Sequence, residues 1–171
     1  VVGMTLKLIP DPDNKDEGPC GRDAVRDAKK VADYIGIPHY SVNAVEIFRE
    51  SVIDYFIKEY QKGRTPNPCM RCNEMIKFGL LMDKADESGC QFLATGHYAR
   101  IESGALYRGK DSNKDQSYFL YSVYKKDPSR ILFPLADMDK PYIRKIAAER
   151  GLPSAGRSES QDICFVPDGD Y

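Results

Sequence analysis

The chain has 171 residues, a hydrophobic fraction of 42% and a formal net charge of −1 at pH 7. These values are ordinary for a globular protein with a sizeable core. They exclude a strongly basic nucleic-acid-binding chain, so any nucleic acid would have to be held by a local patch. The sequence has no apolar run of about 18 residues and no signal-peptide pattern, so we expect no membrane span and a cytoplasmic location. Its five cysteines are an odd number, which argues against a secreted disulfide framework and for reactive or metal-binding thiols.

The first hundred residues alternate between strand-like and helix-like patterns. Residues 1–9 are mostly apolar, which predicts a buried strand, and the run starts as it would in a chain cut from a longer one. The later segments are a helix at 22–35, a strand at 38–43, a helix at 45–60, a further helix to about residue 88 and a strand at 91–95. This order predicts an α/β fold with an open parallel sheet and helices on both faces. Ligands of such sheets bind beyond the carboxyl ends of the strands, where Gly96 and His97 would lie.

The second part of the chain has a different pattern. Two short strands at 98–101 and 105–108 flank Ser103 and Gly104 and predict a hairpin. The segments that follow are a polar loop at 109–116, an aromatic run at 117–124, and a helix that Asp139 caps and Gly151 ends.

The stretch GRTPNPCMRCNEMIKF at residues 63–78 has the strongest chemical signal. Its two prolines predict a stiff loop, with Asn67 as N-cap and Pro68 at the first position of a helix. Cys69 and Cys72 would then share one face near the helix start, where unpaired amides and the helix dipole lower thiol pKa values. Positive charge from Arg71 acts in the same direction.

Simpler interpretations of these residues remain open. A CxxC pair can be half of a structural zinc site, although no second pair of ligands at short spacing exists here. It can be a redox dithiol, although that motif normally follows the first strand of its fold. Cys164 lies among apolar residues and can be a core cysteine, and His97 can be a hydrogen-bonded histidine at a strand end. Cys90 has no supporting context.

Longer strings carry a resemblance to a known family. They are TPNPCMRCN followed by EMIKFG, then ATGHYAR, DSNKDQSYFLY, LFPLADMDKPYIRKIAAERGLP and SESQDICFVPDGDY. With their order and spacing, the chain closely resembles the bacterial tRNA-specific 2-thiouridylases, and the match runs over residues 1–171. The resemblance implies an adenine nucleotide alpha hydrolase-like fold of the PP-loop ATPase type. It also implies an enzyme that uses ATP with Mg to place sulfur on C2 of the wobble uridine in the tRNAs for Lys, Glu and Gln.

In this family ATP adenylates the C2 oxygen of the uridine, which makes AMP the leaving group. The resemblance implies that sulfur arrives as a persulfide on Cys164, supplied by a cysteine desulfurase or a relay protein. Cys72 matches the nucleophile that releases this sulfur, and whether the two thiols pass through a disulfide is left open.

The family's binding positions also fall on residues of this chain. Contacts to the target base fall on Asn67, Pro68 and Cys69, and a further tRNA contact falls on His97. The loop that contacts tRNA matches Lys114, Asp115 and Gln116. ATP contacts match Gly96 and Leu6, where many members have Met.

Two departures from the family pattern matter. The phosphate-binding string SGGxDS is not found in this chain. We therefore expect a nucleotide-binding α/β domain at 1–109 that lacks its first strand and phosphate loop. Residues 110–171 would be the rest of the catalytic domain and the start of a central tRNA-binding domain, with the C-terminal parts absent. Such a chain alone would be inactive, and the alternative is a fragment that binds tRNA or a sulfur carrier.

The second departure is Cys69, where many members carry Asp. Cys69, Cys72 and Cys164 could supply three thiolates to an iron–sulfur cluster, which would make the chain a redox or iron–sulfur module. Three close thiols would also suit a persulfide relay.

Overall fold

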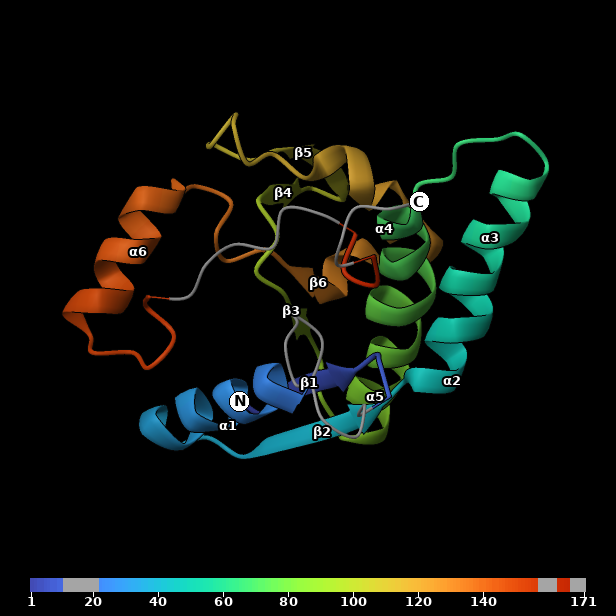
Figure 1. Ribbon diagram of the computed structural model, residues 1–171. Coiled ribbons are helices and arrows are strands. Elements are labelled where there is room, and N and C mark those ends of the chain that lie inside the picture. The colour runs from blue at the N-terminus through green and yellow to red at the C-terminus, as the bar shows by residue number, and fades with distance from the viewer. Residues whose placement is uncertain (11–21, 157–162, 167–171) are drawn as a thin grey trace. The chain divides into compact units, whose positions relative to one another are not determined.

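A computed structural model of the chain describes residues 1–10, 22–156 and 163–166 (Figure 1). Contacts between residues divide the chain into two compact units. Unit 1 consists of residues 1–55 and 144–171, and unit 2 consists of residues 56–143. The predicted division at residue 109 concerns functional domains, and it stays a prediction.

Unit 1 is built on a parallel strand pair. β1 (Gly3–Lys7) runs beside β2 (His39–Asn43), with Gly3 opposite His39 and Lys7 opposite Asn43. α1 (Arg22–Ile35) connects the two strands and packs against β1. It ends as predicted at Gly36, whose φ of 72° is readily accessible only to glycine. Parallel pairing requires such a crossover, so the strand–helix–strand order led to the correct topology here.

A long helix follows β2; its residues up to Tyr55 belong to unit 1 and those from Phe56 to unit 2. It comprises α2 (Val45–Phe48), the π-helical segment η1 (Arg49–Ile53) and α3 (Asp54–Gln61). Phe48 and Val52 are buried, and the ring of Phe165 packs edge-on against Phe48 with 5.8 Å between the ring centroids. Tyr55 and Tyr60 lie at the edge of this face and remain partly exposed.

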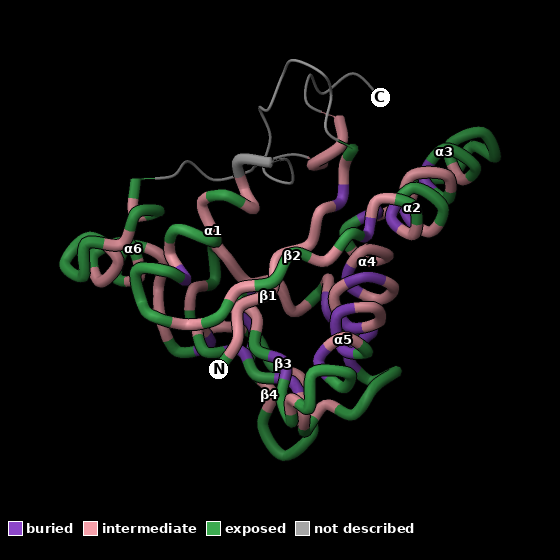
Figure 2. The backbone as a smooth tube through the Cα atoms, turned by 90° about the horizontal axis from the view of Figure 1, so that it is seen from below, coloured by how far each residue is buried: buried purple, intermediate pink, exposed green. Residues whose placement is uncertain are grey.

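Unit 2 contains a second long helix. α4 (Pro68–Cys72), the π-helical segment η2 (Asn73–Leu80) and α5 (Leu81–Glu87) follow one another without interruption. Figure 2 shows buried positions along α4 and α5. The buried residues of this helix include Phe78, Met82 and Ala85. The sequence therefore predicted the course of this helix, to about residue 88.

The strands of unit 2 form two pairs. β3 (Leu93–Ala94) pairs in parallel with β6 (Ile131–Leu132), and β4 (Ala99–Glu102) pairs with β5 (Ala105–Arg108) in the predicted antiparallel hairpin. β3 is shorter than the predicted strand at 91–95. Within the described residues the strands form three two-stranded sheets, where the sequence predicted one open sheet. A sequence pattern locates strands but does not choose their partners, and β6 is too short to produce a pattern of its own.

Unit 2 also contains two 3-10 helices, one of which is the aromatic run, and the next helix begins in unit 2 and continues into unit 1. η3 (Ser117–Lys125) and η4 (Pro128–Arg130) are 3-10 helices, and α6 (Lys140–Glu149) begins at the predicted cap. Asp139 Oδ1 accepts a hydrogen bond of 2.9 Å from the backbone N–H of Tyr142. Among the helices described, none is long and apolar enough to cross a membrane.

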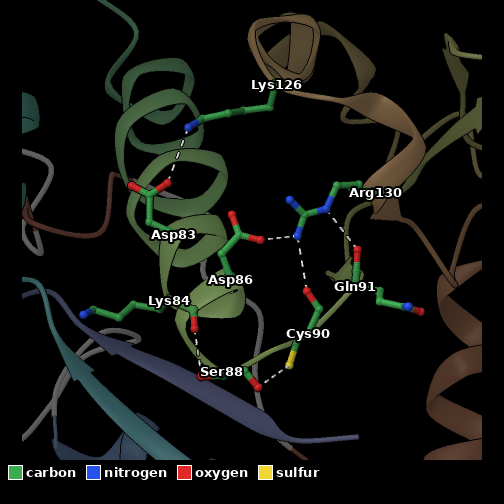
Figure 3. Close-up of polar contacts among 8 residues, drawn as sticks. All are labelled: Asp83, Lys84, Asp86, Ser88, Cys90, Gln91, Lys126 and Arg130. Carbon is green, nitrogen blue, oxygen red and sulfur yellow. Dashed lines mark hydrogen bonds and ion pairs between the residues drawn. The ribbon is translucent and has the colours of Figure 1, made fainter.

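Arg130 joins η4 to the end of α5 (Figure 3). Its guanidinium donates hydrogen bonds to the backbone oxygens of Gln91 and Cys90, at 3.0 and 3.2 Å, and to the carboxylate of Asp86. The hydrogen bond from Arg130 lowers the pKa of Asp86, and the carboxylate in turn raises the pKa of Arg130. The guanidinium of Arg130 therefore forms hydrogen bonds with three residues at and just after the end of α5, before β3 begins.

Candidate functional site

The helix that carries the two cysteines starts as its sequence predicts. Asn67 has an extended backbone, and its Oδ1 accepts a hydrogen bond of 3.1 Å from the backbone N–H of Met70. Pro68 occupies the first helical position and is buried. The side-chain bond satisfies an amide that the helix leaves unpaired, and the fixed φ of proline suits this position. Cys69 and Cys72 therefore lie in the first turns of a helix whose N-terminus is capped.

Cys69 is exposed and Cys72 is half-buried. They are three residues apart in α4, so they lie on neighbouring positions of one helix surface. The structure thus confirms the local placement that was predicted from the CxxC spacing.

Glu74 links this helix to η3. Its carboxylate lies 3.4 Å from the guanidinium of Arg71 and 2.5 Å from the ammonium of Lys125. The hydrogen bond from Lys125, followed by the charges of Lys125 and Arg71, outweighs burial and lowers the pKa of Glu74. Glu74 therefore pairs with one cation on its own helix and with one on η3.

Asn73 makes a second link between the same elements. It is buried, and its Nδ2 donates a hydrogen bond of 2.9 Å to the backbone oxygen of Phe119 in η3. Its Oδ1 is also buried and accepts no hydrogen bond from any residue that the structure describes. The contact fixes the position of η3 beside Cys72 through a neutral side chain.

His97 is buried and engaged at both ring nitrogens. Nε2 lies 3.3 Å from the ammonium of Lys77, and Nδ1 lies 2.8 Å from the hydroxyl of Thr95. Because the ammonium can only donate, the neutral ring carries its proton on Nδ1 and donates it to Thr95. Burial, with the charge of Lys77, lowers the pKa of His97 to about 3. His97 is therefore an uncharged acceptor that orients Lys77.

The predicted tRNA-contacting loop is held by two of its own side chains. Gln116 Oε1 accepts from the backbone N–H of Tyr98 at 3.1 Å, and the N–H of Gln116 donates to Tyr98 O at 2.9 Å. Asp115 accepts from the N–H of Gly109 at 3.0 Å and from the hydroxyl of Ser117 at 2.8 Å. Burial would raise the pKa of Asp115, but these hydrogen bonds outweigh it and lower the pKa.

Gly109 allows the loop to approach the hairpin closely. A Cβ atom at this position would lie 2.9 Å from the backbone carbon and oxygen of Tyr98. The side chains of Asp115 and Gln116 thus shape the loop by binding backbone groups.

The remaining predicted positions are distributed over both units. Gly96 follows β3 in unit 2, while Leu6 lies in β1 and Cys164 near Phe165 in unit 1. A Cβ at Gly96 would meet only the side chain of Leu135, at 3.7 Å, so packing within the described residues does not itself require glycine there. A cavity of about 380 Å³ lies between β1 and α1, but its lining is mainly apolar and excludes Leu6.

The described residues do not form a metal centre. No group of three or more His, Cys, Asp or Glu side chains in this part of the chain is placed to hold a metal ion. They also contain no phosphate-binding loop of the expected type.

The parallel strands, flanking helices and thiol-bearing helix define an α/β domain of the class that supports nucleotide-dependent chemistry. The chain matches the family described as "tRNA methyl transferase HUP domain" over residues 1–168, and it belongs to that family.

The curated relatives of this chain have a more specific name than the family. One is the tRNA-specific 2-thiouridylase MnmA 1 of Caldanaerobacter subterraneus subsp. tengcongensis, 48% identical over all of this chain and 50% of that protein. Another is the tRNA-specific 2-thiouridylase MnmA of Geobacter metallireducens, 54% identical over 89% of this chain and 43% of that protein. The enzyme of the same name from Heliobacterium modesticaldum is 48% identical over all of this chain. The chain spans about half the length of these relatives.

Sequence reasoning missed three polar residues at this site, namely Asn73, Glu74 and Lys77. All follow Cys72 on the same helix, and their partners lie 20 to 51 positions away in the sequence. The signal that could have identified Asn73 is an amide among the apolar positions of a buried helix face. Glu74 and Lys77 gave no such signal, because charged residues on helices are mostly solvated.

Proposed function

We propose that the complete protein is a tRNA sulfurtransferase that converts C2 of the wobble uridine to the thiocarbonyl in an ATP-dependent reaction. The observation that carries this proposal is the cysteine pair at the capped start of α4, in a chain of the HUP-domain family whose curated relatives are named 2-thiouridylases. A uracil C2 carbonyl is a poor electrophile. Adenylation of its oxygen would supply the leaving group that a sulfur nucleophile needs.

In the proposed sulfur transfer, Cys164 carries a persulfide and the thiolate of Cys72 is the nucleophile. Attack of the Cys72 thiolate on Sγ of Cys164, the inner sulfur of the persulfide, forms a Cys72–Cys164 disulfide and expels the outer sulfur as hydrosulfide. Hydrosulfide then adds to the activated C2, and AMP leaves. The disulfide must be reduced by an external thiol before the next cycle, and the persulfide must be renewed by a cysteine desulfurase or a relay protein.

The tRNA would be held by residues of unit 2. We infer that Asn67, Pro68 and Cys69 contact the target base, and that Lys114 contacts the tRNA backbone from the loop that Asp115 and Gln116 hold in shape. His97 would act on the tRNA through Lys77, because its ring is buried and both of its nitrogens are engaged.

Further parts of the proposal come from the family pattern. ATP with Mg would lie near Leu6 and Gly96, and the substrates would be the tRNAs for Lys, Glu and Gln in the cytoplasm. Residues 1–109 would form most of the nucleotide-binding domain, and residues 110–171 would lead into the tRNA-binding part. The phosphate-binding loop would come from outside this chain.

The decisive experiment is nucleoside mass spectrometry of unmodified glutamate tRNA, after incubation with the complete gene product, ATP, a cysteine desulfurase and cysteine. We expect 2-thiouridine at the wobble position. Cys72→Ser and Cys164→Ser should each abolish it, because each removes a sulfur that the transfer needs. Cys90→Ser is the matched control and should retain activity, since Cys90 lies at the end of α5 outside this site.

Other outcomes of these experiments would favour a different function or contradict part of this proposal. No 2-thiouridine with any sulfur donor would favour a module that binds tRNA or a sulfur carrier without catalysis. Stoichiometric iron in anaerobically purified protein, lost in the variants of Cys69, Cys72 or Cys164, would favour an iron–sulfur site on those cysteines. Pyrophosphate release by residues 1–171 alone would contradict the proposal that the phosphate loop lies outside this chain.

A further inference from the structure

Three exposed tyrosines form a row on η3. Tyr118, Tyr121 and Tyr124 are three residues apart, and a 3-10 helix has three residues per turn, so they project from one face. Their exposed fractions are 72%, 49% and 54%. An α-helix would have rotated them progressively apart, so the 3-10 conformation itself produces the row.

The opposite side of η3 is anchored in the core of unit 2. Leu120 and Val123 are fully buried, so the helix cannot turn its tyrosines inward without exposing them. The Asn73 hydrogen bond to Phe119 and the Glu74 ion pair with Lys125 hold η3 against η2. The tyrosine row is therefore a rigid surface, and the element that bears it also contacts α4, the helix with Cys69 and Cys72.

The charges near this row favour an anionic partner. Arg71 on α4 and Lys125 on η3 both pair with Glu74, and Lys114 precedes η3 in the loop. Exposed aromatic rings with cations nearby are features by which proteins bind single-stranded nucleic acid, through stacking and phosphate contacts.

We propose that Tyr118 and Tyr121 form a stacking platform for unpaired bases of the tRNA anticodon loop, next to the helix that presents Cys72. This inference rests on the proposed function, because it takes the RNA substrate from it. Tyr124 extends the platform at its far end, where its hydroxyl accepts a hydrogen bond from the backbone N–H of Leu106 and fixes the ring relative to β5.

The test measures binding of an unmodified glutamate anticodon stem–loop to the complete gene product by fluorescence anisotropy. Tyr118→Ala and Tyr121→Ala should each raise Kd about fivefold or more, because each removes the stacking surface for a base. Tyr118→Phe and Tyr121→Phe keep the rings and should bind within about twofold of the wild type. Tyr142→Ala is the matched control, since Tyr142 is 52% exposed on α6.

Two further measurements make the test specific. The slope of log Kd against log salt should stay unchanged in the tyrosine variants, whereas Lys114→Ala should reduce it by about 0.7. A stem–loop with 5-iodouridine in the loop should crosslink to Tyr118 or Tyr121 on irradiation, and peptide mass spectrometry would locate the crosslink.

The proposal is overturned if the Tyr118→Ala/Tyr121→Ala double variant binds within twofold of the wild type and no crosslink maps to η3. It is also overturned if both tyrosines resist iodination in the RNA-free protein, because another part of the protein then covers them. If the wild type forms 2-thiouridine in either case, the proposed function stands and only the stacking platform is lost. If the wild type forms none, the proposed function fails separately.

Discussion

At the residue scale, the contacts of His97 change the interpretation of a histidine that the sequence places at a strand end. A histidine next to RNA suggests a cation that binds phosphate, but this ring is buried between Phe78 and Phe133, with 5.9 Å between the centroids in each case. Its neighbours Thr95 and Lys77 fix a neutral tautomer. The charge that reaches the surface here belongs to Lys77.

We expect His97 to remain neutral down to about pH 4, because its pKa in the folded protein is about 3. The unfolded chain has an ordinary histidine pKa of about 6.5, so between these values the unfolded state binds the extra proton. The contribution of the neutral His97 ring to the free energy of unfolding is therefore complete above about pH 6.5, and it is lost as the pH falls below that value. Nitrogen NMR of the ring should show the Nδ1–H tautomer without titration from pH 8 to 5.

The variant His97→Gln allows the same effect to be measured through the pH dependence of the free energy of unfolding. Between pH 7 and 5 the free energy of unfolding of the wild type should fall by about 2 kcal/mol more than that of His97→Gln, which cannot titrate. Equal pH dependence in the two proteins, or a ring that titrates near pH 6.5, would show that His97 is not held neutral.

The N-cap at Asn67 could be predicted from the sequence, whereas the contact between His97 and Lys77 could not. A cap is local, because the donor lies three residues after the acceptor. Thr95 is a local partner, two residues before His97, but Lys77 reaches the ring from 20 residues earlier in the chain. The role of Gln116 was hidden for the same reason, since its backbone partner, Tyr98, lies 18 residues earlier.

At the element scale, the junction between η2 and η3 decides which surface the tyrosine row presents. The buried amide of Asn73 is its central contact, and the buried Oδ1 of this side chain has no donor among the described residues. Neutrality is therefore essential at this position, because a buried charge without a partner is costly.

We predict that Asn73→Asp lowers the free energy of unfolding by about 3 kcal/mol or more at pH 7. It removes the donor to Phe119 O and places a carboxylate in a site with no described donor for it. Chemical denaturation of the complete gene product would measure the loss. Asn113→Asp introduces the same change at an exposed loop position and should change the stability by less than about 0.5 kcal/mol.

A loss of stability of the same small size in both variants would show that the junction tolerates charge. In that case Oδ1 of Asn73 would have access to water, and the position of η3 would depend mainly on the Glu74 ion pairs and on Leu120 and Val123.

At the scale of the whole molecule, each compact unit has its own buried aromatic residue. Phe48 in unit 1 and Phe78 in unit 2 are both fully buried. Regions with separate cores can open as separate cooperative units, which hydrogen exchange detects. The division of the chain into two units therefore has a consequence for its dynamics.

We predict that Phe78→Ala reduces the protection of core amides in unit 2, such as those of Leu120 and Val123, by about 3 kcal/mol or more of opening free energy. Amides around Val52 in unit 1 should keep theirs. Phe48→Ala should produce the opposite pattern, and hydrogen exchange with mass spectrometry would measure both. Equal loss of protection in the two units, with either variant, would show that the chain opens as a single body.

The sequence by itself determined the local structure of this protein. Helical spacing, caps and prolines predicted α1, the capped start of α4, the hairpin and the α/β class, because these depend on contacts between residues close in the chain. Only the tertiary structure decided that β3 pairs with β6, that His97 holds Lys77 and that η3 turns its tyrosines outward. These depend on groups far apart in the sequence that meet only when the elements pack, and a single sequence has no periodicity that records which elements meet.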